Sequence, residues 1–178
     1  PEKSRISVFF PGTLDYSSEI WYDSGERREK CPVGDLLKRR GYPMTRREAR
    51  ELAFSLLYEL TFFPEKDPEE LYRSEQEMRP FEEDDYVKTV VVGAAKSKEQ
   101  IDALVERYSN GWKVKRISRI SLAILRLCIY EMLYVEDIPF SVSINEAVEL
   151  CKKYNDDKAP AFVNGILNTI ADKEGLKG

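Results

Sequence analysis

From Met44 onward the sequence predicts an all-α fold, a compact helical bundle of about six to seven helices. Three observations lead to this prediction. Apolar residues recur at intervals of three and four along several segments, which is the spacing of one helix face. The alternation of apolar and polar residues that marks a strand is absent from this part of the sequence. A Ser or Thr followed three residues later by Glu or Gln, a pattern that starts helices, occurs at Thr45–Glu48, Ser97–Gln100 and Ser143–Glu146.

The first expected helix carries the clearest apolar stripe. It starts at the Thr45–Glu48 pattern, and Pro64 and Pro68 end its regularity. Its apolar residues are Ala49, Leu52, Ala53, Leu56, Leu57 and Leu60. The acidic stretch 65–81 that follows is irregular, with a short helix expected around 69–77.

Five further segments show helical spacing, at residues 86–95, 98–108, 117–134, 143–154 and 161–171. Asn110-Gly111 is expected to end the second of these, because both residues tolerate the left-handed backbone that follows many helices. The third is apolar on most sides, which predicts a central helix. A turn is expected at 137–140, before the fourth.

Residues 1–43 do not share this periodicity. Short apolar pieces alternate with Pro and Gly, so one or two weak strands or a flexible arm are expected. The chain begins with Pro, and Lys38-Arg39-Arg40-Gly41 could be encoded by a purine-rich ribosome-binding sequence close before Met44. Two hypotheses follow: the segment is translated leader, or it is a genuine basic extension. The domain itself is expected at 44–178.

Composition argues against hydrolytic, acyl-transfer and zinc chemistry. The chain has no histidine, which removes the most usual general base and the commonest metal ligand. Its three cysteines are far apart and form no metal or disulfide pattern, so we expect reduced thiols in a cytoplasm. No apolar run is long enough to span a bilayer. We also expect no cofactor.

The net charge of the chain does not indicate a nucleic-acid partner. The formal net charge is −4, and residues 44–178 carry 20 basic and 25 acidic side chains. Any binding to nucleic acid must therefore rest on a local patch. Arg46, Arg47 and Arg50 supply one at the start of the first helix, where guanidiniums and free backbone N–H groups together suit phosphate. A solvated basic face is the alternative from periodicity alone, and the isolated Lys96 and Lys98 add little to either interpretation.

Other candidate sites have simpler explanations. The acidic residues 82–85 are more typical of a solvated helix start than of a metal site. Glu146 fits a helix cap, and Gly165 a close contact between helices. Trp112 and the tyrosines are more often residues of the core or its edge than platforms on which bases stack.

Several strings of residues resemble the NusB family of transcription antitermination factors. The stretch 46–53, ending in Leu57-Tyr58, is similar to the family's opening helix, and 124–131 to its central helix. The segments 137–140, 144–150 and 162–167 are similar to its C-terminal half. The resemblance runs in order across nearly all of residues 44–172, and residues 1–43 lie outside it.

The resemblance implies a protein that is not an enzyme and that binds the boxA element of ribosomal RNA leader transcripts together with the ribosomal protein NusE. The pair would join the RNA polymerase antitermination complex. It also implies roles for particular residues. The RNA-binding set that it implies is Arg46, Arg47, Arg50 and Asp137, and the partner-binding set is Tyr58, Glu99 and Phe140. Lys96 joins the RNA-binding set because of its position beside the second and third expected helices, not because of the resemblance.

Three alternatives stay open at this stage. The domain could be the RNA-binding front of an rRNA cytosine methyltransferase, although no segment for a cofactor-binding α/β domain follows the last helix. It could be a purely protein-binding helical adaptor. Salt-dependent RNA binding would distinguish an RNA-binding protein from such an adaptor. It could also form a homodimer that hides the RNA surface, as some family members do.

Overall fold

The computed structural model describes residues 21–23, 28–30, 44–78 and 85–176. From residue 44 these hold seven α-helices and one 3₁₀ turn, so the predicted all-α fold is confirmed. The elements are α2 (Arg46–Leu60), α3 (Pro68–Met78), α4 (Asp85–Lys96), α5 (Lys98–Tyr108), η1 (Val114–Arg116), α6 (Arg119–Tyr134), α7 (Phe140–Tyr154) and α8 (Ala159–Lys173).

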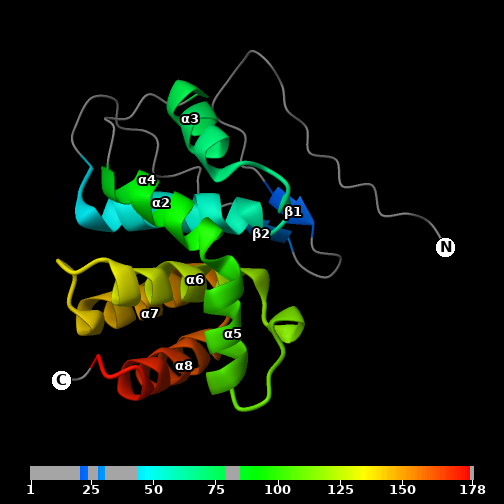
Figure 1. Ribbon diagram of the computed structural model, residues 1–178. Helices are drawn as coiled ribbons and strands as arrows, with labels where there is room; N and C mark the ends of the chain where they lie inside the picture. The colour runs from blue at the N-terminus through cyan, green and yellow to red at the C-terminus, as the bar shows by residue number, and fades with distance from the viewer. Residues whose placement is uncertain (1–20, 24–27, 31–43, 79–84, 177–178) are drawn as a thin grey trace.

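The helices form two layers around α6 (Figure 1). α2 and α4 lie side by side on one side of α6, and α3 packs against both. α7 and α8 lie on the other side, and α5 runs across α6 and α8. α6 packs against α2, α4, α5, α7 and α8, which makes it the predicted central helix.

Burial explains the pattern of α6. Almost every residue from Ile120 to Met132 is buried, because neighbours cover this helix on all sides. The core holds the apolar stripe of α2 from Ala49 to Leu57 and buries Val87, Val90 and Val91 of α4. Two charged residues, Glu131 and Arg126, are buried within this same apolar helix. Each of them must therefore find a partner.

Close approach of two helices accounts for Gly93. A methyl group at this position of α4 would overlap the ring and hydroxyl of Tyr130 on α6. Gly165 on α8 is different, since a methyl there would meet nothing within 4 Å. The close helix contact expected at Gly165 was therefore wrong, and the one at Gly93 was not foreseen.

Two of the three predicted capping boxes were wrong. Thr45 caps α2 in both directions, as predicted. Ser97 precedes α5 but its side chain makes no cap hydrogen bond. Ser143 lies inside α7, because that helix starts three residues earlier, after Pro139. The fixed backbone of Pro139 suits a helix start, and this takes the place of the serine.

The chain before residue 44 contains a short ladder among the described residues. β1 (Trp21–Asp23) pairs antiparallel with β2 (Arg28–Lys30), with Trp21 opposite Lys30. This agrees with the weak strands expected there. Cys31 lies outside the described residues.

Candidate nucleic-acid interface

The start of α2 presents two exposed arginines beside a well-formed helix cap. The backbone N–H of Thr45 donates to Glu48 Oε2 at 2.8 Å, and the backbone N–H of Glu48 donates to Thr45 Oγ1 at 3.2 Å. The cap fixes the first turn, from which Arg46 and Arg47 extend into solvent. Helix geometry thus sets two guanidiniums next to a positive helix end, an arrangement suited to phosphate.

Arg50 has a different environment. It is 6% exposed, and its Nε donates to Glu131 Oε1 at 2.8 Å. Burial works against its charge, but the Glu131 carboxylate, together with Tyr86 and Glu146, outweighs that effect and raises the pKa of Arg50. The predicted surface role of Arg50 therefore needs correction: its guanidinium lies in the core, where it neutralises Glu131.

Tyr86, in the first turn of α4, joins these groups together. Its hydroxyl donates to the same Glu131 oxygen that Arg50 contacts. Burial, followed by the Glu131 charge, raises the pKa of Tyr86, so its hydroxyl remains a donor. The guanidinium carbons of Arg46 and Arg50 lie 5.4 and 5.8 Å from the centroid of its ring. The exposed Arg46 is thereby connected with the core.

Basic side chains of α7 extend this surface. Lys153 Nζ lies 2.6 Å from Glu51 Oε1 of α2, so the last turn of α7 sits beside α2. Lys152 pairs with Glu149 at 2.7 Å and lowers the pKa of that carboxyl, with a further contribution from Arg47. Lys152 and Lys153 are both exposed. The sequence analysis missed them because basic residues often end helices without binding anything.

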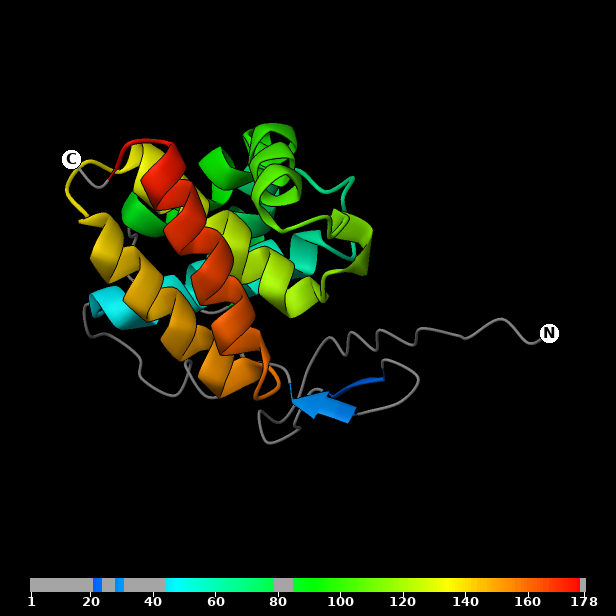
Figure 2. The ribbon, with the colours of Figure 1, turned by 90° about the horizontal axis from the view of Figure 1, so that it is seen from below.

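Lys96 and Asp137 are less closely tied to this surface. Lys96 ends α4, eleven positions after Asp85, and pairs with Glu69 of α3 at 3.0 Å. Asp137 is exposed in the turn between α6 and α7. That turn lies at the same end of the bundle as the start of α2 (Figures 1 and 2). The turn with Asp137 therefore lies at the same end of the bundle as Arg46, and Lys96 lies at the far end of α4.

The three expected partner-binding residues lie on three different helices. Tyr58 is mostly buried, stacked on Phe54 at 6.1 Å and edge-on to Phe62 at 5.1 Å. Glu99 is exposed in the first turn of α5. Phe140 opens α7. Of the three, Tyr58 is the most buried and Glu99 the most exposed.

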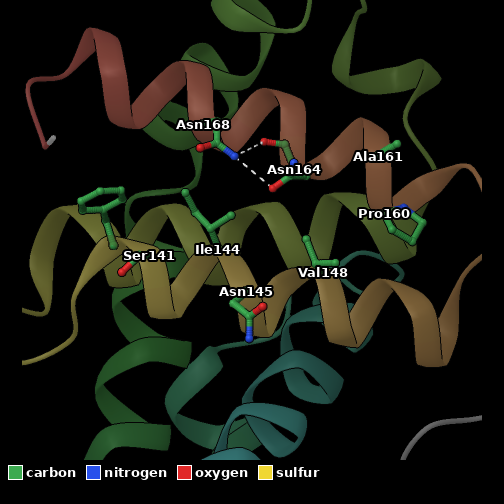
Figure 3. Close-up of a pocket in the computed structure, with 9 residues that line it drawn as sticks. Ser141, Ile144, Asn145, Val148, Pro160, Ala161, Asn164 and Asn168 are labelled. Atoms are coloured by element: carbon green, nitrogen blue, oxygen red, sulfur yellow. Dashed lines mark hydrogen bonds between the residues drawn. The ribbon is translucent and has the colours of Figure 1, made fainter.

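Phe140 lines a shallow groove between α7 and α8, with a volume of about 470 Å³ (Figure 3). Its lining is uncharged and includes the side chains of Ile144 and Val148. The amide of Asn168 donates to the backbone and side-chain oxygens of Asn164, each at 3.0 Å. The groove offers no cation for phosphate, and its one hydroxyl side chain is that of Ser141.

The described residues hold no group of three or more side chains placed to bind a metal ion. Cys128 and Cys151 are buried and free, and burial raises the pKa of both thiols, that of Cys151 to about 12. Within the described part of the chain, no helix has the length and apolar character to cross a membrane. Of the acidic stretch considered as a metal site, residues 82–84 lie outside the described part, and Asp85 is exposed.

Comparison with known proteins identifies the family. The model of the NusB family matches residues 47–172. This chain belongs to the NusB family. The transcription antitermination protein NusB of Acetivibrio thermocellus is 44% identical over 128 residues, covering 71% of this chain and 88% of the relative. That of Ruminiclostridium cellulolyticum is 43% identical over 129 residues, covering 72% and 89%.

Solved NusB structures have the same fold. T. maritima NusB matches with a TM-score of 0.64 and 31% identity, covering 77% of this chain and all of the other. A complex of the antitermination factors NusB and NusE with double-stranded RNA matches with a TM-score of 0.63 and 30% identity, covering 73% and 99%. The family is not enzymatic, which confirms that expectation for this chain.

Proposed function

We propose that this antitermination factor binds boxA-type RNA of ribosomal RNA leader transcripts in the cytoplasm, together with NusE, and so joins the RNA polymerase antitermination complex. The observation that carries the proposal is the pair of exposed arginines, Arg46 and Arg47, on the capped end of α2. Lys152 and Lys153 on α7 add to the same positive surface. The relatives in the solved complex bind NusE and RNA, which supports both partners.

The charge distribution suits a binder that needs its partner. In a chain with a net charge of −4, a few cations neutralise few phosphates, so RNA binding alone should be weak and sensitive to salt. A second protein that holds the same RNA raises its effective concentration at the site. We therefore expect NusE to tighten RNA binding without any change in the arginine surface.

Single-stranded RNA is the proposed ligand because unpaired bases expose their edges to side chains. The solved complex of relatives contains double-stranded RNA, so both forms belong in the test. The two relatives compared above are antitermination proteins whose own lengths are covered to 88% and 89%, which favours the antitermination role over the methyltransferase alternative. A purely protein-binding adaptor remains the outcome to exclude.

The test measures the affinity of the full chain for a boxA oligonucleotide, a scrambled oligonucleotide and a boxA duplex, with and without NusE, at two salt concentrations. We expect preference for single-stranded boxA, weaker binding at high salt and tighter binding with NusE. The Arg46→Ala, Arg47→Ala double variant should bind boxA more than about tenfold less tightly, because two charge-assisted contacts are lost.

The matched control removes two exposed cations elsewhere, Arg107→Ala on α5 and Lys173→Ala on α8. It should leave boxA binding within about twofold of the parent chain, since long-range charge effects are screened by salt. Equal losses in the two double variants would show that net charge alone drives binding. Absence of any boxA preference would leave the adaptor as the function.

A further inference from the structure

An exposed cation and a buried ion pair meet at one aromatic ring. The ring of Tyr86 has the guanidinium carbons of Arg46 and Arg50 within 6 Å of its centroid, at 5.4 and 5.8 Å. Both distances are in the range of cation–π contacts. Arg46 is exposed, whereas Arg50 is buried. The ring of Tyr86 therefore connects a surface arginine to the interior of the protein.

The position of that ring is fixed by three helices. Tyr86 belongs to α4, its hydroxyl donates to Glu131 of α6, and the same carboxylate oxygen accepts from Arg50 of α2. Glu131 is 1% exposed and Tyr86 is 8% exposed. Because these groups are nearly closed to water, any movement of the ring would leave a buried carboxylate or hydroxyl without its partner.

This arrangement restricts the side chain of Arg46, unlike that of an isolated surface arginine. A long exposed side chain samples many rotamers and loses that freedom when it binds a ligand. A ring held in place beside its guanidinium restricts it before binding. Arg47, its neighbour in sequence, has no described ring contact of this kind and provides an internal comparison.

We propose that Tyr86 is a positioning residue for RNA binding: its ring holds Arg46 in a phosphate-binding orientation, and the Arg50–Glu131 ion pair holds the ring. This inference rests on the proposed function, because it assigns Tyr86 a role at the same surface. It assigns Tyr86 and Glu131 no direct contact with RNA.

The first experiment is a double-mutant cycle on the affinity of the full chain for boxA RNA. Tyr86→Leu should weaken binding by about three- to fivefold, the size expected for the loss of one cation–π contact. In the Arg46→Ala background the same change should have an effect of less than about twofold. In the Arg47→Ala background it should keep its full effect. Tyr86→Phe keeps the ring but removes its hydrogen bond to Glu131, so it should weaken binding by less than Tyr86→Leu does.

The outcomes distinguish failure of the positioning role of Tyr86 from failure of the proposed RNA-binding function. Equal effects of Tyr86→Leu in the Arg46→Ala and Arg47→Ala backgrounds would mean that Tyr86 acts through general stability, and would overturn the positioning role. The same holds if Arg46→Ala weakens binding while Tyr86→Leu does not. If the parent chain shows no boxA preference, the proposed function itself fails.

A second measurement covers the case in which Tyr86→Leu does not fold, and it uses the parent chain. In an NMR spectrum of the arginine side chains, the Nε–H signal of Arg46, assigned with Arg46→Lys, should be shifted upfield by the ring. It should also be less mobile than that of Arg47. An Arg46 signal with the shift and mobility of Arg47 would overturn the proposal.

Discussion

Three arginines within one and a half turns of α2 have three different environments. Arg47 is exposed, Arg46 is exposed but lies on the Tyr86 ring, and Arg50 is buried against Glu131. Their residue type could not separate these roles in the sequence. The signal was positional: Arg50 lies beside Ala49 and Ala53 on the buried face of α2, and Glu131 lies within the apolar α6. Opposite charges in two buried helix faces indicate an internal ion pair.

The buried pair makes a prediction about single residues. Arg50→Ala leaves the Glu131 carboxylate, 1% exposed, without its cation. We expect this change to lower the free energy of unfolding by about 3–5 kcal/mol, as is typical when one partner of a buried pair is removed. Denaturant unfolding of the parent and variant chains measures the difference.

The control is Lys152→Ala, which breaks the exposed pair with Glu149. An exposed pair contributes at most about 1 kcal/mol, so its loss should be small. Similar losses for both variants would mean that the interior around Glu131 is open to water. For this reason Arg50→Ala is a poor test of RNA contact, and Arg47→Ala is a clean one.

At the scale of elements, helical spacing predicted α2 and α4 to α8 but not how each one begins, and α3 lies in a stretch without that spacing, where only a short helix was expected. Periodicity reports which face is buried, and burial is what stabilises these helices. A start pattern is a weaker signal, because Ser-x-x-Glu also occurs within helices. In α7 the pattern at Ser143 lies three residues inside, after the start set by Pro139. The Lys153–Glu51 contact, between residues far apart in sequence, had no local signal at all.

The capping box confirmed at Thr45 and the one wrongly predicted at Ser143 lead to a pair of predictions. Thr45→Ala removes the side-chain acceptor for the Glu48 backbone N–H, and we expect a loss of about 1 kcal/mol in the free energy of unfolding. Ser143→Ala should be neutral or stabilising, because the Ser143 hydroxyl is buried and has no hydrogen-bond partner among the described residues. Thermal unfolding of the two variants compares them directly. A larger loss from Ser143→Ala would mean that its hydroxyl has a partner in solution.

At the scale of the whole molecule, the fold followed from the sequence more completely than the site did. A fold depends on many apolar positions, so a few misplaced caps do not change it. The candidate surface depends on a few side chains whose exposure is set by neighbours on other helices. Arg46 and Arg47 were predicted as part of it, Arg50 was misplaced on the surface, and Lys152 and Lys153 were missed because their position beside α2 is a property of the bundle.

The buried thiols give a prediction about the stability of the whole bundle. Burial raises the pKa of Cys151 from 9.0 to about 12, and that of Cys128 well above 9.0. Above about pH 9 the unfolded chain therefore releases thiol protons that the folded chain keeps, so the free energy of unfolding falls as the pH rises. Each thiol contributes up to about 1.4 kcal/mol per pH unit until its folded pKa is reached. Below pH 9 both states hold these protons, and the thiols give no pH dependence.

Comparison with a Cys151→Ala variant isolates this effect from the titration of lysines and tyrosines. Unfolding measured from pH 8 to pH 11 should show a shallower decline in stability for the variant than for the parent chain. The two curves should be parallel below pH 9, where only the packing of residue 151 differs. Parallel curves over the whole range would mean that the Cys151 thiol ionises as easily in the folded bundle as in the unfolded chain. In that case the packing around Cys151 would admit water.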